Sequence, residues 1–529
     1  MKSLTGTWAL VRFTLRRDRL LLPLWVAAVS VVPLATVSGF RTLYPTEEAL
    51  VTAAEGLGTN PAFRAMFGPV YAPNLGALVA WRASIALVII AVISLLTVIR
   101  HTRVEEDSGR RELVGSTVVG RHAPLTAALI VVVLGDLAVG VVAAAGVMAQ
   151  GLAVTGSIAF GIQLAAAGII FAIVGALAAQ LTEGAGAARA IGLSVVGFAY
   201  ALRAAGDAGD TAWLSWVSPI GWVQRLRPFA AEQWWVLLLV AALGGVVVVG
   251  AYALASRRDV GGGVLRPRPG PAVAGPRLGS PLGLAWRIHR GLLYGWTAGL
   301  IALGGIYGSV AQGVGDLLKD NPDLARIFER MGGTSATIID MYLSGVIGVL
   351  ALFAAAYAVQ AALRLRVEEE AQRVEQVLAT AVRRPRWTIA HLTFAFGGPA
   401  VAMAGAGLGV GITYGAITGD LGGQVPRVLA AALGRLPAVW LLAAIVVALF
   451  GVRPRLSSFG WAVYGAVVFI TFIGAILQLG QWFMDLSPFT HIPNLPGGEV
   501  LALPLVALIA IAASLAAVGV AGFTRRDLG

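Results

Sequence analysis

The chain has 529 residues, of which 58% are hydrophobic and only 12% are charged, and its mean hydropathy is +0.82. A soluble domain is about 45–50% apolar and about 25% charged, so this composition excludes soluble and disordered proteins and predicts a polytopic membrane protein. The formal net charge of +12 is typical of arginine-rich cytoplasmic loops in such proteins, and we expect no nucleic acid partner.

The predicted membrane spans are apolar runs of the length that a helix needs to cross a bilayer, which is roughly 20 residues. A basic amphipathic segment over Gly6–Arg19 precedes them and is expected to lie on the membrane surface. The runs fall near 20–40, 76–99, 124–149, 157–181, 186–205, 232–256, 292–313, 340–363, 388–415, 427–451, 457–481 and 499–523. Arg435 lies inside one of these runs unless that span begins near Leu436. We therefore expect an all-α protein with twelve transmembrane helices.

Arginines gather after the second and the eighth predicted spans. Basic residues are enriched in cytoplasmic loops, so both segments and both chain termini are predicted to be cytoplasmic. The order of several motifs also repeats along the chain. The matching pairs are Arg103–Asp107 with Arg366–Glu370, Asn60-Pro61 with Asn321-Pro322, Ser218-Pro219 with Ser487-Pro488, and Arg257–Gly261 with Arg525–Gly529.

The repeat divides the chain into two halves of six spans each. Because six is an even number, the two copies have the same orientation, as in a parallel repeat about an axis along the membrane normal. A stretch rich in Pro and Gly separates them and reads as a cytoplasmic linker. We expect a first half at 1–258, a linker at 259–282 and a second half at 283–529.

The most specific feature is the acidic triplet that follows the second span of each half, Glu105–Asp107 and Glu368–Glu370. At helical spacing, Glu106–Arg110 and Glu369–Arg373 are i,i+4 pairs with the acid first, which is the favourable order. Each segment is therefore predicted to be a charged helix that projects from the membrane. The alternative is a solvated hairpin whose charges only fix the topology, but such a hairpin has no need for the same residue order twice.

The segment Arg103–Leu113 resembles the coupling helix of ABC-2-type exporter permeases. The whole chain is similar to the fused, twelve-span permeases of actinobacteria that are described as exporters of polyketide antibiotics and other drugs. The Ser-Pro-Ile-Gly-Trp sequence at 218–222 and the Arg-Arg-Asp tails add to this likeness. The second half departs from the pattern, because Ala371-Gln372 replaces the Ser-Gly pair at 108–109.

The resemblance implies a permease subunit, not an enzyme, in a bacterial plasma membrane. It would be energised by two copies of a cytoplasmic ATPase subunit, which would bind ATP and Mg. This chain has only two lysines, Lys2 and Lys319, and neither stands in a P-loop sequence, so we expect it to bind no cofactor. Cysteine is absent and the five histidines are far apart in the sequence, so no metal site is expected. The expected coupling residues are Arg103, Glu105, Glu106, Asp107, Arg110, Glu112, Arg366, Glu368, Glu369, Glu370, Arg373 and Glu375.

Two residues are candidates for the path of an amphiphilic small-molecule substrate. Asp136 lies near the middle of the third span, where an ionised group is costly and faces the bundle or a cavity. A cation-binding or proton-linked role would fit this position, but a structural hydrogen bond to a neighbouring helix is the favoured explanation. Trp222 belongs to a group of tryptophans near the outer ends of the fifth and sixth spans, which form an interfacial belt or a re-entrant exit gate.

The main alternative is a proton-coupled secondary drug transporter, because such carriers also have twelve spans in two parallel halves. Two sequence features weigh against it. The loop after the second span carries the acidic triplet in place of the Gly-x-x-x-Asp-Arg pattern of those carriers, and Asp136 is the one acid found well inside a span.

Overall fold

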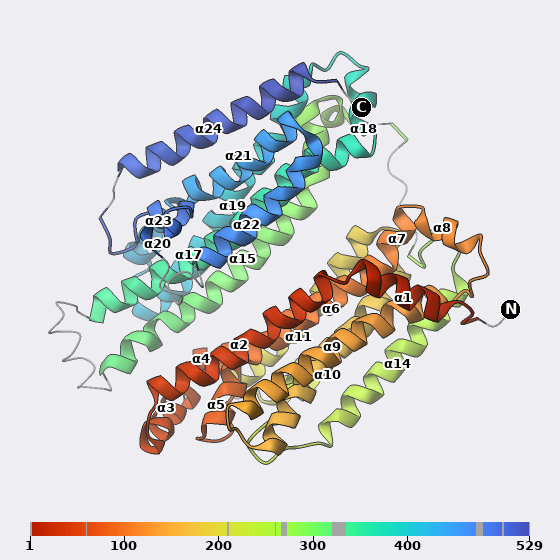
Figure 1. Cartoon of the computed structure of the whole chain (residues 1–529). Helices are drawn as coiled ribbons and strands as arrows, with labels where there is room; N and C mark the ends of the chain where they lie inside the picture. The colour runs from red at the N-terminus through yellow and green to blue at the C-terminus, as the bar shows by residue number, and fades with distance from the viewer. Residues whose placement is uncertain are drawn as a thin grey trace. The chain divides into compact units, whose positions relative to one another are not determined.

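The chain folds as two compact units, Met1–Pro269 and Gly270–Gly529, and the boundary between them falls within the expected linker. The computed structural model describes residues 3–59, 61–208, 211–259, 261–265, 272–273, 275–319, 335–471, 480–499 and 502–527. Within these ranges all regular secondary structure is helical (Figure 1). Asn60, Asn321 and Pro322 of the repeated landmarks lie outside the described residues, as do Leu528 and Gly529.

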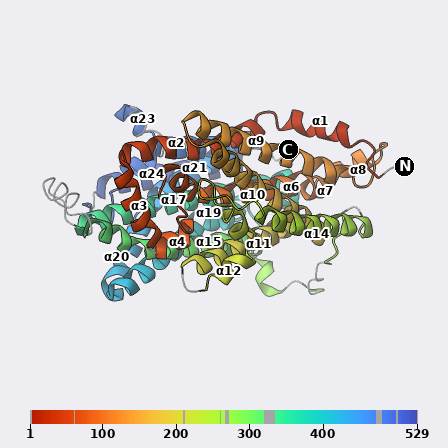
Figure 2. The same ribbon diagram turned by 90° about the horizontal axis from the view of Figure 1, so that it is seen from below.

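Unit 1 begins with a short helix and continues through six long ones with shorter helices between them. Its helices are α1 Thr7–Arg17, α2 Leu21–Leu43, α3 Glu47–Thr59, α4 Pro61–Phe67, α5 Leu75–Arg82, α6 Ser84–His101, α7 Arg103–Asp107, α8 Arg110–Gly115, α9 Ala123–Ala149, α10 Val154–Leu181, α11 Ala185–Ala208, α12 Trp213–Val217, α13 Pro219–Gln224 and α14 Val236–Arg257. The surface helix that the sequence predicts corresponds to α1, which packs beside α9 (Figures 1 and 2).

Unit 2 is also helical, and its three longest helices have 39, 36 and 35 residues, against 28 for the longest helix of unit 1. Its elements are the 3₁₀ helix η1 Pro276–Gly279, α15 Pro281–Lys319, α17 Ser335–Glu370, α18 Arg373–Leu378, α19 Arg384–Thr418, α20 Leu421–Leu433, α21 Leu436–Val452, η2 Pro454–Phe459, α22 Gly460–Phe469, α23 Gln481–Met484, η4 Pro488–His491 and α24 Ala502–Arg525. In this unit the surface segment and the first span are one continuous helix, α15, whereas α1 and α2 are separate.

Ten helices among the described residues are long and apolar enough to cross a membrane. They include all six runs expected in the first half and four of those expected in the second. The run expected at 292–313 lies within α15, whose apolar stretch is diluted by glycines. The run expected at 457–481 begins in η2, continues through α22 and includes 472–479, outside the described residues.

Arg435 lies at the boundary between two helices of unit 2. Helix α20 ends at Leu433 and α21 begins at Leu436, so Arg435 stands at the N-cap between the two helices. Its guanidinium donates to the Ser344 hydroxyl at 2.8 Å and to the Ser344 carbonyl at 3.2 Å. Helix α21 therefore begins at Leu436, and the buried charge of Arg435 is held by hydrogen bonds. Because α20 and α21 together form one apolar stretch over Leu421–Val452, the start of the span near Leu436 stays a prediction.

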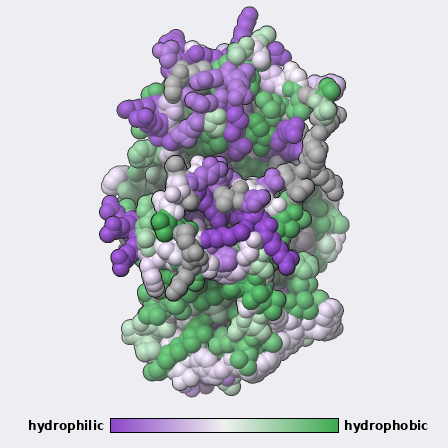
Figure 3. Space-filling view, turned by 90° about the vertical axis from the view of Figure 1, so that its right-hand side faces the viewer, coloured by the Kyte–Doolittle hydropathy of each residue, from purple (hydrophilic) through white to green (hydrophobic). Residues whose placement is uncertain are grey.

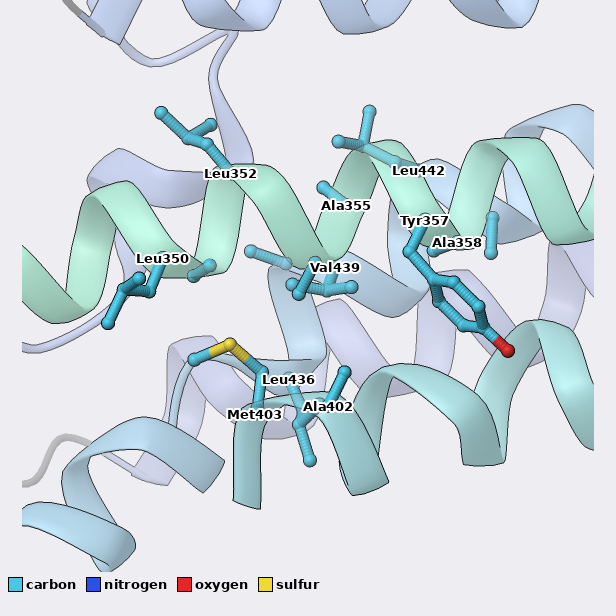
Figure 4. Close-up of a cluster of buried hydrophobic side chains, with 14 of the residues drawn as sticks. Leu350, Leu352, Ala355, Tyr357, Ala358, Ala402, Met403, Leu436, Val439 and Leu442 are labelled. Carbon is cyan, nitrogen blue, oxygen red and sulfur yellow. The ribbon is translucent and has the colours of Figure 1, made fainter. Parts of the chain in front are cut away.

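Glycines let the helices of each unit approach closely, as small residues do in membrane bundles. In unit 1, a Cβ added at Gly140 of α9 would lie 2.6 Å from the carbonyl oxygen of Gly161 on α10. In unit 2, Gly398 of α19 leaves room for the ring of Tyr357, whose hydroxyl donates to the Phe394 carbonyl at 3.1 Å. Tyr357 is the polar member of the buried cluster shown in Figure 4, in which α17, α19 and α21 meet.

The outward faces of the helices are apolar, as contact with lipid requires. On α14, for example, Leu238 is 71% exposed and Val249 is 68% exposed. Hydrophilic residues gather instead at one end of each unit. In unit 1 this end carries α7 and α8, and in unit 2 it carries α18 (Figure 1). Figure 3 shows hydrophilic patches bordered by hydrophobic surface.

Candidate functional site

Each acidic triplet lies in a helical hairpin, not in one continuous helix. In unit 1, α7 ends at Asp107 and α8 begins at Arg110, and between them Gly109 has a φ of 71°. In unit 2, α17 ends at Glu370 and α18 begins at Arg373, and Gln372 has a φ of 55°. Gly109 and Gln372 occupy equivalent positions of the repeat (372 − 263 = 109). The prediction of a single charged helix is therefore wrong, because the helix is interrupted in both copies by a residue of left-handed backbone conformation at the equivalent position.

The turn also changes the charge pairing. The predicted i,i+4 pairs Glu106–Arg110 and Glu369–Arg373 require an unbroken helix. With the helix broken, Arg110 lies 3.6 Å from Glu105, and Arg373 contacts Glu368 at 2.7 Å. The predicted pairs are therefore wrong, and each acid of a triplet has a separate environment.

Glu106 is the centre of a buried charge cluster in unit 1. Its carboxylate is inaccessible to solvent and accepts from Arg103 at 2.5 Å and from Arg258 at 2.7 and 2.8 Å. Arg111 completes the set as a further ion-pair partner. Burial, together with the nearby Arg258 and Arg103, lowers the pKa of Arg111 to about 10. Three guanidinium groups thus surround one carboxylate.

Arg103 fixes this cluster to the rest of unit 1. Its side chain is completely buried. It donates to the carbonyl oxygens of Ala179 at 3.0 Å, Gly262 at 2.8 Å and Thr182. A buried arginine is stable only when its donors are satisfied in this way. The start of α7 is thereby joined to the end of α10 and to the chain that follows α14.

Unit 2 satisfies its triplet with fewer arginines. Glu369 accepts from both terminal nitrogens of Arg526, each at 2.6 Å. Glu368 is buried and pairs with Arg373 and, at 3.1 Å, with Arg364. The hydrogen bond from Arg373 to this carboxylate raises the pKa of Arg373. Glu370 is the exposed member, with Arg366 at 2.6 Å.

Helical spacing in the sequence does not indicate the partners of the triplets. Arg258 and Arg526 were recognised as repeat landmarks only, yet each binds the middle acid of the triplet in its own unit. The arginine that opens the third span adds an equivalent contact in both units. Arg121 donates to the Arg258 carbonyl at 2.6 Å, and Arg384 donates to the Arg526 carbonyl at 2.6 Å. Each half of the sequence contains, in the same order, an acidic triplet, an arginine that opens the third span and a tail arginine, Arg258 or Arg526. This repetition is the sequence feature that points to the contacts.

Only part of the expected coupling set is available for contact with another protein. Internal ion pairs engage the carboxylates of Glu106, Glu368 and Glu369, and the side chain of Arg103 is buried. Asp107 accepts from the Ala185 amide at 2.8 Å, at the start of α11. The members that are exposed on the hairpins are Asp107, Arg110, Glu112, Glu370, Arg373 and Glu375.

The surface helix α1 is joined to the first hairpin. Arg17 donates to Glu105 at 2.6 Å, across the gap between the two elements. The next residue, Asp18, is buried and contacts Arg100 and His101 at the end of α6. Helix α1 and the residue after it are therefore joined by side-chain contacts both to the first hairpin and to the end of α6.

The two candidate substrate-path residues lie in different surroundings. Asp136 is buried on α9, accepts from the Ser94 hydroxyl of α6 at 2.5 Å, and packs against Gly168 of α10. Trp222 is half-buried on α13 and donates to the Trp216 carbonyl. A cavity of about 450 Å³ lies at the end of unit 1 opposite the hairpin, and neither residue lines it.

Comparison with known proteins identifies the family. The chain is 47% identical over 526 residues to the multidrug efflux system permease protein Rv1217c of Mycobacterium tuberculosis, a match that covers 99% of this chain and 95% of that protein. Residues 278–524 also match the family described as multidrug efflux system permease Rv1217c, C-terminal domain. The chain therefore belongs to the family of the Rv1217c efflux permease, which confirms its resemblance to ABC-type exporter permeases.

Proposed function

We propose that this chain is the membrane subunit of an ATP-driven exporter of drug-like, polyketide or lipid-like amphiphiles. Two copies of a separate cytoplasmic ATPase would dock on the two hairpins, one on each unit. ATP and Mg would be bound by those subunits. The related permease from Mycobacterium tuberculosis is a multidrug efflux protein, which supports this substrate class.

The sequence supports an external energy source. A P-loop uses a lysine in a Gly-Lys-Ser/Thr sequence to reach the nucleotide phosphates. Lys2 follows Met1 and Lys319 follows Leu318, so neither lysine of the chain stands in such a sequence. An ATP-driven pump built on this chain therefore needs a second protein that binds the nucleotide.

The observation that carries the proposal is the pair of equivalent hairpins. Each unit has one hairpin at its hydrophilic end. The two hairpins turn at equivalent positions, and in each the middle acid binds the tail arginine of its own unit, Arg258 or Arg526. Each also leaves an exposed acid at the same place, Glu112 and Glu375 (375 − 263 = 112). Exposed carboxylates can form charge-assisted contacts with a basic partner, while the buried pairs keep the hairpin rigid enough to transmit its movement. Both chain termini and both hairpins would then be cytoplasmic.

Reversing the two exposed acids tests this assignment. Glu112→Arg with Glu375→Arg is expected to lower co-purification of the ATPase subunit and ATP-dependent transport by at least tenfold, because like charges repel across an interface. The folded protein should be unaffected, since both side chains are exposed.

The matched control reverses two exposed acids at the opposite end of unit 1, Glu47→Arg with Glu48→Arg. It should leave co-purification and transport unchanged. Normal co-purification and normal transport by the Glu112/Glu375 variant would show that the hairpins are not the docking sites.

A further inference from the structure

In both units, one arginine joins three parts of the chain that are far apart in sequence. Arg258 follows α14 and binds Glu106, 152 residues earlier, and Arg526 follows α24 and binds Glu369, 157 residues earlier. The main chain of each tail arginine is also fixed, because its carbonyl accepts from the arginine that opens the third span of its unit. The hairpin, the third span and the last span therefore meet at one residue.

The geometry of the two pairs is that of strong arginine–carboxylate contacts. Both terminal nitrogens of each guanidinium reach both oxygens of the acid, at 2.6–2.8 Å. Such bidentate pairs fix direction as well as distance. The carboxylate of Glu106 is fully buried and that of Glu369 is only 10% exposed, so water competes little with either contact.

We propose that Arg258 and Arg526 are positioning residues that make each hairpin move together with the last span of its own unit. This inference rests on the proposed function, in which a partner pushes on the hairpins. Both middle acids lie where the second span of their unit continues toward the hairpin, so without the tail arginine a push would reach the last span only through the helices packed between them. With the tail arginine in place, the displacement reaches the last span directly.

The two units do not rely equally on this contact. Glu106 keeps Arg103 and Arg111 as partners if Arg258 is removed. Glu369 has Arg526 as its partner among the described residues, so removing Arg526 leaves a nearly buried carboxylate without an ion pair. Arg526 also lies over the rings of Phe450 and Phe523, 5.0 and 5.1 Å from their centres, which fixes it against the helices of unit 2. Unit 2 is therefore expected to be more sensitive than unit 1 to the loss of its tail arginine.

The first measurement needs only this chain. Because the sequence has no cysteine, Gln376→Cys on α18 and Val518→Cys on α24 provide two unique spin-label sites, and both positions are exposed. In lipid nanodiscs, Arg526→Gln is expected to broaden the distance distribution between the labels. Exchanging the charges with Glu369→Arg plus Arg526→Glu should restore the narrow distribution. In unit 1 the labels are placed at Glu112→Cys and Val249→Cys. There, Arg258→Gln should broaden the distance distribution between the labels much less than Arg526→Gln does in unit 2.

The second measurement is the number of substrate molecules transported per ATP hydrolysed with the ATPase subunit present. Arg526→Gln should lower this ratio about tenfold while the ATPase subunit still co-purifies, and the exchanged pair should recover it. Arg526→Lys keeps the charge but contacts one oxygen at a time, so its transport ratio should lie between those of the unaltered protein and Arg526→Gln. If Arg526→Gln does not fold, Arg526→Lys is used in its place. An unchanged distance distribution in Arg526→Gln, or no recovery in the exchanged pair, would overturn the inference. Failure of any ATPase to bind would overturn the proposed function and leave the distance result standing.

Discussion

Arg103→Met is expected to lower the free energy of unfolding by about 3 kcal/mol, because each buried carbonyl oxygen that loses its donor costs about 1–3 kcal/mol. Arg103 is completely buried and joins Glu106 to the carbonyl oxygens of Ala179, Thr182 and Gly262. The substitution removes all four contacts and leaves the buried carbonyl oxygens of Ala179 and Thr182 without their side-chain donor, whereas Glu106 and Gly262 keep Arg258. Unfolding of the purified protein in detergent, followed by circular dichroism against denaturant, measures the change.

The repeat supplies the control. Arg366 occupies the equivalent position in the second half, but it is 21% exposed and its partner Glu370 is 59% exposed. Exposed pairs contribute about 0–1 kcal/mol, so Arg366→Met should have a small effect. Equal losses in the two variants would contradict the distinction between a buried and an exposed contact.

The second large effect is expected at the closest helix contact of unit 1. Gly161→Val places a branched side chain where α9 and α10 touch through Gly140, and no rotation of a side chain can relieve a clash with a backbone carbonyl. We expect a loss of about 3 kcal/mol, at the upper end of the usual cost of overpacking. The melting temperature and the yield of monodisperse protein should both fall.

Gly197→Val on α11 is the matched control, because a Cβ at Gly197 meets no atom within 4 Å. It adds the same side chain to another long helix of the same unit. A melting temperature that falls as far in Gly197→Val as in Gly161→Val would mean that the close helix contact is not the cause.

The sequence predicts the spans well because their signal is local. Apolar length alone locates every long helix of the first half, and the fourth predicted run, 157–181, ends where α10 ends at Leu181. The same signal is weaker in α15, where glycines lower the hydropathy without breaking the helix. Arg435 shows that a charge inside a predicted run marks a helix boundary.

The hairpins show where local reasoning fails. Gly109 is a residue that adopts positive φ easily, so the first turn had a signal in the sequence. Gln372 has no such preference, so the sequence gives no signal for the second turn, which lies between residues that form ion pairs with Arg373 and Arg526. Spacing arguments assume a continuous helix and therefore assign the wrong partners to both middle acids.

The pairing of the tail arginines with the triplets depends on tertiary structure. Helical periodicity relates residues three or four positions apart, whereas Glu106 and Arg258 are 152 positions apart. What the sequence contains is the coincidence that both members recur in the same order in both halves. Treating recurring charged residues of opposite sign as candidate partners would have found both contacts.

Transport by the purified chain tests the central claim most directly. The protein is reconstituted into liposomes with a fluorescent amphiphilic drug, with and without the ATPase subunit, in the presence of ATP and, separately, of a proton gradient alone. Export is expected only when both the ATPase subunit and ATP are present, and Asp136→Asn should leave it within about twofold, because an amide still accepts from Ser94. Transport by the chain alone, driven by the proton gradient and abolished by Asp136→Asn, would contradict the account and identify a secondary carrier.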